Sequence, residues 1–549
     1  MSLDSITTLD SLLTFRAEDS PNHRFLIRPV EDTANTAFEE ITYGIFDFHV
    51  SQLAKAWMIE ETAKKPEGSQ LRPKAVVGVF FPSGYTLAVV MFALIRLGVV
   101  PFCLSLETLR KASSTSVKTI FQNDDQLRVR ILEVARSDLA YCSATTEAGR
   151  FSYPQLSPGL ISGQDTVVLQ HTSGSTAFPK PVKLSNALLL RSIRGGSWWV
   201  EGFHSQSDIA LGQPPIFHVF GFIGGLLNAL LRGHTFAFPP LPPSDNGGLF
   251  PSSDTLRSYA TRISATEFFG VSSTVVGLAR CEGGMELFKS MRRVVVGGAP
   301  MPRANGDWIV QHGVHLVEVF GSTEAGSLLN SNRPVGDPAW QSMRVCSNLP
   351  HHFEPYGPAP HTVFELVLHS SPLTGEFSAA DTQTGYFHTH DLFQEWPNPG
   401  SGTWRHCGRS DDVLLLSSGQ NWNPRPMELQ IEAVLNGSTA CCHLWTCPSA
   451  SWGTHSPRAS GPGSMVADVE PEAREAIWAA IQVANAVAPS NARIARDSVL
   501  LVTAKGVVPL DDPKTEPKNI PIADKGTPLR AKTYALFAEE IDSVYKGVV

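Results

Sequence analysis

Residues 170–183 read Gln-His-Thr-Ser-Gly-Ser-Thr-Ala-Phe-Pro-Lys-Pro-Val-Lys, a run of small hydroxylated residues that ends at Lys180. Apolar residues 167–169 precede the run and residues 181–184 are again extended in pattern, so we expect a hairpin with the run at its tip. Small side chains leave hydroxyls and backbone N–H groups accessible to a polyphosphate. A Walker loop differs, because its Gly-Lys-Ser/Thr leads directly into a helix. The alternative is an ordinary Ser/Thr-rich surface turn.

Alternating strands and helices around this hairpin predict an α/β fold. Residues 75–81 and 99–104 are apolar strands, and Ser83 can cap the helix between them. Continuous apolar strands joined by helices indicate a parallel sheet that is covered on both faces. Two further apolar strands, 294–296 and 316–320, end in small or polar turns. In such sheets ligands collect beyond the carboxyl ends of the strands.

Composition narrows the class of protein. With 42% hydrophobic and 17% charged residues the chain is ordinary for a globular protein, and its net charge of −8 with no basic patch disfavours a nucleic-acid partner. The apolar stretch 85–104 is interrupted by Arg96 and Gly98, which argues against a membrane span. The eight cysteines form no CxxC pair and the N-terminus is no signal peptide, so we expect a cytoplasmic protein. A metal site around residues 441–447 is the weaker alternative, since no second ligand pair follows.

The length of 549 residues predicts more than one domain. We expect a large N-terminal domain, 1–409, of layered sheets with flanking helices, and a small α+β C-terminal domain, 410–549. A strand at 403–407 precedes the boundary, and an amphipathic helix at 472–488 lies beyond it. The Pro/Ser/Gly-rich stretch 450–464 is predicted to be a loop.

Nearly the whole chain resembles the acyl-adenylate-forming (AMP-binding) enzymes, motif by motif and in the same order. Besides the loop at 170–183, the matching segments are 75–104, Pro-Ile-Phe-His-Val-Phe-Gly at 215–221, Val-Phe-Gly-Ser-Thr-Glu at 319–324, Phe-His-Thr-His-Asp at 387–391 and Gly-Arg-Ser-Asp-Asp at 408–412. The chain departs from the family pattern at Ala177, Pro181 and His390, where glycines are usual, and at Phe320, where tyrosine is usual.

The resemblance implies a nucleotide site for ATP and Mg²⁺, built from several polar turns. The phosphates would be held by Thr172, Ser173, Gly174, Ser175, Thr176 and Lys180. Glu324, with Thr323 beside it, would supply a hard oxygen ligand to Mg²⁺. Adenine would lie between Phe320, Gly321 and Ser322 on one side and the turn Gly298, Ala299, Pro300 on the other. Asp391 and Arg409 would bind the ribose; their alternatives are a loop cap and a surface ion pair.

The resemblance also implies an acyl pocket lined by Phe217, His218, Phe220, Val271, Val296 and Gly297. His218 would gate this pocket, although a hydrogen-bonded core histidine is the alternative. Relatives that activate amino acids carry an aspartate in the 217–221 segment, and this chain has none. Because an unpaired buried ammonium is costly, we expect a compact or aromatic acid without a free α-amino group.

The C-terminal segment 520–530 resembles the last family motif, which implies that Lys525 bridges the substrate carboxylate and the α-phosphate. Asp411 falls on the family's hinge, about which the C-terminal domain would rotate. The order Lys-Gly-Thr at 525–527 resembles fungal reductase-type proteins related to nonribosomal peptide synthetases. It favours a chain cut from a longer protein that passes its acyl group to the phosphopantetheine thiol of a carrier domain. A free-standing acyl- or aryl-CoA ligase and a nucleotide-binding module without catalysis are the alternatives.

Overall fold

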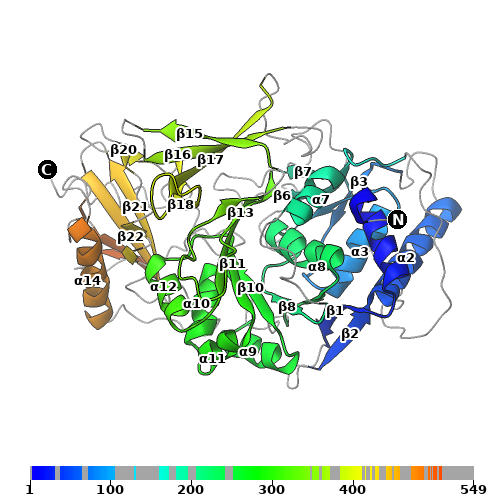
Figure 1. The fold of residues 1–549 in the computed structure, drawn as a ribbon, viewed down its shortest axis with the longest axis horizontal. Helices are drawn as coiled ribbons and strands as arrows, with labels where there is room; N and C mark the ends of the chain where they lie inside the picture. Colours follow the sequence, from blue (N-terminus) through cyan, green and yellow to red (C-terminus); the bar gives the residue numbers. More distant parts are fainter. Residues whose placement is uncertain are drawn as a thin grey trace.

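The structure is a computed structural model, and Figure 1 shows its ribbon. It describes residues 3–30, 37–64, 72–104, 129–131, 160–171, 181–195, 206–240, 251–346, 349–357, 362–370, 384–410, 414–415, 421–422, 427–428, 430–431, 440–447, 450–457, 471–487, 493–494, 496, 499–503 and 506–509. The expected α/β class is confirmed, since strands and helices alternate along most of the chain.

The first sheet has five strands in the order β5-β3-β4-β6-β7. These strands are β3 (Val76–Val79), β4 (Val100–Cys103), β5 (Val129–Ile131), β6 (Thr166–His171) and β7 (Pro181–Ser185). The helix α3 (Tyr85–Arg96) connects the parallel strands β3 and β4, as the sequence predicts. Its N-cap is Gly84 and not Ser83; the Ser83 hydroxyl instead accepts a hydrogen bond from the Ile216 backbone N–H at 2.9 Å.

The two strands of the predicted hairpin are present. Strands β6 and β7 pair antiparallel, with Gln170 opposite Val182 and His171 opposite Pro181. Residues 172–180, which include the six predicted phosphate ligands, lie outside the described residues.

The second sheet has nine strands in the order β14-β13-β12-β11-β10-β8-β9-β1-β2. They are β1 (Arg24–Pro29), β2 (Phe38–Thr42), β8 (Ile209–Gly212), β9 (Thr235–Ala237), β10 (Glu267–Val271), β11 (Arg293–Gly297), β12 (Leu316–Ser322), β13 (Gly326–Asn330) and β14 (Arg344–Val345). The inner strands from β1 to β12 are parallel to one another, and the two ends of the sheet are antiparallel.

Both faces of this sheet are covered. Along β11, Val294 and Val296 face one apolar cluster and Val295 faces the other, because successive side chains of a strand point to opposite sides. One face carries α9 (Ser253–Arg262), α10 (Ser272–Arg280), α11 (Gly284–Ser290) and α12 (Arg303–Gln311). The other face meets η4 (Phe220–Leu227), α8 (Asn228–Arg232) and α7 (Asn186–Gly195), which separate it from the five-stranded sheet (Figure 1). Helices α1 (Leu9–Asp19) and α2 (Tyr43–Lys64) belong to the same cluster.

A third sheet follows as a meander of β15 (His351–Tyr356), β16 (Val363–His369), β17 (Tyr386–Glu395) and β18 (Trp404–Arg409). Beyond it lie β19 (Leu414–Leu415), β20 (Asn421–Trp422), β21 (Ala440–Cys447), β22 (Ala450–Pro457), β23 (Val499–Thr503), β24 (Gly506–Pro509) and the helix α14 (Pro471–Val487). The prediction of a loop at 450–464 is wrong for residues 450–457, because they form β22 and pair with β21.

The C-terminal part has an apolar cluster of its own, in which Ile431, Ile481 and Val499 are fully or almost fully buried. Its mixed helix and strand content agrees with the expected small α+β unit. The boundary at 409/410 stays a prediction, and Asp411 and Lys525 lie outside the described residues. No helix in the described part of the chain combines the length and the apolar character of a membrane span.

Candidate active site

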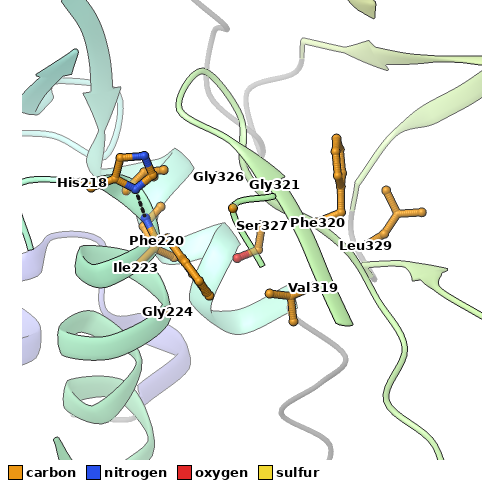
Figure 2. A pocket seen from close by; sticks show the side chains of 12 residues that line it. His218, Phe220, Ile223, Gly224, Val319, Phe320, Gly321, Gly326, Ser327 and Leu329 are labelled. Atoms are coloured by element: carbon orange, nitrogen blue, oxygen red, sulfur yellow. Dashed lines mark hydrogen bonds between the residues drawn. The ribbon is translucent and has the colours of Figure 1, made fainter. Parts of the chain in front are cut away.

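A pocket of about 60 Å³ opens where β11 and β12 end and η4 begins. The η4 side is made by His218, Val219, Phe220, Ile223 and Gly224, and the strand side by Gly298, Val319, Phe320, Gly321, Gly326, Ser327 and Leu329. In Figure 2 the Ser327 hydroxyl points toward η4; Ser327 and His218 are the polar side chains of a pocket whose other side chains are apolar. The pocket lies at the carboxyl ends of parallel strands, where the sequence predicts ligands to bind.

His218 is held at the rim by a local hydrogen bond. The Phe220 backbone N–H donates to His218 Nδ1 at 3.2 Å, so the ring proton of the neutral imidazole is on Nε2 (Figure 2). The segment that follows is π-helical, a geometry that is frequent at functional sites. His218 is half-buried and lines the pocket, which places it at the rim and not in the core.

The floor of the pocket depends on two glycines at the end of β11. Gly298 has φ +74°, in the left-handed region that favours glycine. A Cβ on Gly297 would lie 2.7 Å from Val319 Cγ2, so only glycine permits this approach of β11 and β12. A Cβ on Gly298 would lie 3.5 Å from Val271 and 3.7 Å from Phe220.

The predicted pocket residues therefore divide into two groups. His218 and Phe220 line the pocket directly, and Val271 and Gly297 lie immediately behind Gly298 and Phe220. Val296 is fully buried, and Phe217 packs against the main apolar cluster. The sequence interpretation missed Ile223 and Gly224, one helical turn after Phe220, and Ser327 and Leu329, which alternate along β13. Helical and strand periodicity were the signals that could have found them.

The predicted nucleotide residues Phe320, Asp391 and Arg409 come together around His406 of β18, which the sequence interpretation missed. The Phe320 and His406 rings are stacked, with centroids 5.1 Å apart and planes at 25°. His406 Nε2 lies 3.2 Å from Asp391 Oδ1, and Arg409 Nη1 lies 3.3 Å from Asp391 Oδ2. Ala299 and Pro300 follow β11 as half-buried residues.

His390, which stands where the family usually has glycine, keeps the backbone that glycine favours. Its φ is +60°, and the pairing of β16 with β17 shifts register between Glu365 and Val367, opposite this segment. The Glu365 side chain accepts a hydrogen bond from the His390 N–H at 3.1 Å. β17 therefore continues to Asp391 with a left-handed residue that is not glycine.

A buried carboxyl group lies behind the predicted adenine turn. Burial raises the pKa of Glu318 to about 7, against the opposing effects of a hydrogen bond from the Met301 backbone and of the Arg405 charge. Glu318 precedes Phe320 by two residues on β12, and Met301 directly follows Pro300. The sequence interpretation did not single out Glu318.

The predicted metal ligand, Glu324, lies in the tight loop between β12 and β13. Ser322 pairs with Gly326, whose φ is +70°, and Ser322 Oγ accepts a hydrogen bond from the Ala325 N–H at 3.2 Å. The half-buried Glu324 and Thr323 offer one carboxylate and one hydroxyl. The described residues hold no cluster of three metal-binding side chains. The carboxylate and hydroxyl of Glu324 and Thr323 fit Mg²⁺, which commonly takes one or two protein carboxylates and completes its shell with phosphate oxygens and water.

Comparison with known proteins places this fold and site in a family. The model of the family described as AMP-binding enzyme matches residues 13–348, and that of the AMP-binding enzyme C-terminal domain matches residues 458–549. The chain belongs to the AMP-binding enzyme family and is an adenylate-forming enzyme.

Individual relatives agree with this assignment. The chain is 25% identical to the non-canonical non-ribosomal peptide synthetase ascB of Acremonium egyptiacum, over 99% of this chain and 48% of that protein. It is 23% identical to the adenylate-forming reductase stbB of Stachybotrys bisbyi, over 99% of this chain and 49% of that protein. It thus spans about half the length of these curated relatives. The adenylation domain of a carboxylate reductase from Mycobacterium chelonae has the same fold, with a TM-score of 0.69, 16% identity and coverage of 98% of this chain and 91% of that chain.

Proposed function

We propose that this chain activates a carboxylic acid with ATP and then passes the acyl group to a thiol. A carboxylate oxygen attacks the α-phosphorus, the bond from that phosphorus to the pyrophosphate oxygen breaks, and acyl-AMP and pyrophosphate form. In the second step a thiolate sulfur attacks the acyl carbonyl, the carbonyl–phosphate oxygen bond breaks, and AMP leaves.

The observation that carries this proposal is the role of β12. Within a few residues this strand supplies Val319 to the pocket wall, Phe320 to the group around Asp391, and the loop that bears Glu324. An acid in the pocket and a nucleotide over Phe320 would therefore meet along one rigid element. Holding two reactants in line is a large part of catalysis for this kind of transfer.

Named residues would divide the work. Asp391 would accept from the ribose hydroxyls with Arg409 beside it, and Phe320 with the turn at Gly298 would hold the adenine. The hydroxyls of 172–176 and Lys180 would bind the phosphates, and Glu324 would hold Mg²⁺. When bound, Mg²⁺ supplies positive charge to the phosphate oxygens. Lys525 would neutralise charge that develops between the carboxylate and the α-phosphate.

The pocket supports an acid that is compact and lacks a free α-amino group. Its described lining includes no carboxylate that could pair with an ammonium ion. Its walls are Phe220, Ile223, Val319 and Leu329, with the Ser327 hydroxyl as a polar group. An aryl acid with an apolar ring, or a ring that carries one hydrogen-bonding substituent, fits these walls.

The thiol would be the phosphopantetheine arm of a carrier domain. The relatives named above are about twice as long as this chain, which supports a further domain as the acceptor. We place the division between the two domains at 409/410, with Asp411 as the hinge. Rotation there would remove Lys525 from the site and admit the thiol.

The deciding experiment is a pyrophosphate-release screen over aryl, indolyl, keto and aliphatic acids. We expect release that requires both ATP and an acid, and we expect Lys525→Ala to lower it by about 100-fold or more while ATP still binds. Lys532→Ala, a neighbouring lysine in the same tail, is the matched control and keeps full activity. Full adenylation by the Lys525→Ala variant would show that this lysine is misassigned.

Two other functions give different results in the same assays. A free-standing acyl- or aryl-CoA ligase acylates coenzyme A as fast as it acylates a phosphopantetheinylated carrier. A nucleotide-binding module without catalysis binds ATP but releases no pyrophosphate with any acid. The feature that favours a nucleotide-binding module without catalysis is the replacement of family glycines at Ala177, Pro181 and His390.

A further inference from the structure

Helix α7 carries a buried arginine behind the loop that bears Glu324. Only 6% of Arg191 is exposed, and burial lowers its pKa to about 10. Among the described residues no carboxylate forms an ion pair with it. Burying a cation without a carboxylate partner lowers the free energy of unfolding, so an apolar side chain in this space would give a more stable fold.

The Arg191 guanidinium donates a hydrogen bond to the backbone of the loop that bears Glu324. Its Nη2 donates to the carbonyl oxygen of Ala325, the residue that follows Glu324, and to Ser192 Oγ at 3.3 Å. Ala325 is fully buried, and its own N–H donates to Ser322. The Ala325 backbone is therefore held by its N–H from within the loop and by its carbonyl from α7.

The next residue on α7 fixes the neighbouring backbone. A Cβ on Gly326 would lie 2.2 Å from Ser192 Oγ, so Arg191 and Ser192 together form the surface on which Ala325 and Gly326 rest. Helix α7 begins directly after β7, the strand that closes the hairpin of residues 172–180. One short helix thus connects the predicted phosphate loop to the predicted metal-binding loop.

We infer that Arg191 is a positioning residue that sets the direction of the Glu324 carboxylate. It acts through the Ala325 carbonyl and does not itself touch the metal or the nucleotide. The inference rests on the proposed role of Glu324 as the Mg²⁺ ligand. Groups that orient a metal ligand typically change metal affinity by about 10- to 100-fold when they are replaced.

The test measures the Mg²⁺ concentration that half-saturates two separate readouts. One is acid-dependent pyrophosphate release, and the other is binding of α,β-methylene-ATP, which cannot release pyrophosphate. We expect Arg191→Met to raise the required Mg²⁺ by about tenfold in both readouts. Arg191→Lys, which keeps the charge and N–H donors but not the planar guanidinium, should give a shift of about threefold, smaller than that of the methionine variant.

The control is Arg194→Met on the same helix. Arg194 also donates to backbone carbonyls, those of Leu3 and Ile6, but it lies away from the Glu324 loop. Its loss should lower the melting temperature and leave the Mg²⁺ requirement unchanged. A folded Arg191→Met variant with the wild-type Mg²⁺ requirement overturns the inference; if that variant does not fold, the same result for Arg191→Lys overturns it. Absence of pyrophosphate release with a normal nucleotide-binding curve would instead refute the proposed reaction.

Discussion

The imidazole of His406 stacks on the ring of Phe320 at a centroid distance of 5.1 Å, although the two residues come from different sheets. The same imidazole approaches the Asp391 carboxylate at 3.2 Å. His406 therefore joins the side chain expected under the adenine to the side chain expected at the ribose. It covers one face of Phe320, so a base can stack only on the other.

Replacing His406 should weaken ATP binding more than it slows chemistry. We expect His406→Ala to raise the KM for ATP by about tenfold, because it removes a ring contact and a partner of Asp391. His406→Phe keeps the ring and should recover about half of the lost binding free energy. Initial rates of pyrophosphate release at varied ATP measure both effects, with the exposed His312→Ala as the control. An unchanged KM for ATP in His406→Ala would show that Phe320 and Asp391 do not bind the nucleotide.

The contrast between His406 and the predicted residues shows what the sequence could provide. The apolar strands, the connecting helix and the Thr323-Glu324 turn are local patterns and are present in the structure, although the strands divide between the five-stranded and the nine-stranded sheet. His406 pairs with Phe393 next to a register shift between β17 and β18, and its ring contacts Phe320 of another sheet; no local sequence pattern encodes either relationship. The sequence predicts a helix cap at Ser83, but its hydrogen-bond partner, Ile216, is distant in sequence. Long-range partners of this kind need the fold itself.

Glu318 should make stability depend on pH. Its folded pKa of about 7 exceeds the ordinary 4.5, so the unfolded chain ionises first as pH rises. Its contribution to stability is complete below about pH 4.5 and is lost as pH rises through 7, an effect of about 3 kcal/mol. Glu318→Gln should remove this loss and be the more stable protein above pH 8. Melting temperatures from pH 5 to 9 measure this pH dependence of stability, and a variant at an exposed position, Glu286→Gln, is the control. Parallel melting profiles for Glu318→Gln and wild type would contradict a raised pKa of Glu318.

The ion pair between Glu267 and Arg293 should be structural and separate from catalysis. The two side chains join β10 to β11 at 2.7 Å, are only 2% and 3% exposed, and lie at the strand ends opposite the pocket. Arg293→Met leaves a buried carboxylate without this partner and should cost about 3–5 kcal/mol in unfolding free energy. The double variant Glu267→Met/Arg293→Met should regain most of that loss, as denaturant titration can measure. A double variant no more stable than Arg293→Met would show that the pair has further essential partners.

Ser327 should affect which acids enter the pocket more than it affects ATP binding. Its hydroxyl is directed toward η4 inside a pocket of about 60 Å³, so a larger side chain occupies space that the acid needs (Figure 2). We expect Ser327→Leu to lower acid-dependent pyrophosphate release by about 100-fold and to weaken α,β-methylene-ATP binding less, because the Phe320 ring points to the opposite face of β12 from the pocket residue Val319. Ser327→Ala should instead keep activity with unsubstituted aryl acids and lose about tenfold with acids whose ring carries a hydrogen-bonding group. Equal losses of activity for both kinds of acid in Ser327→Ala would mean that the hydroxyl does not contact the substrate. The acid would then bind on the other side of Val319.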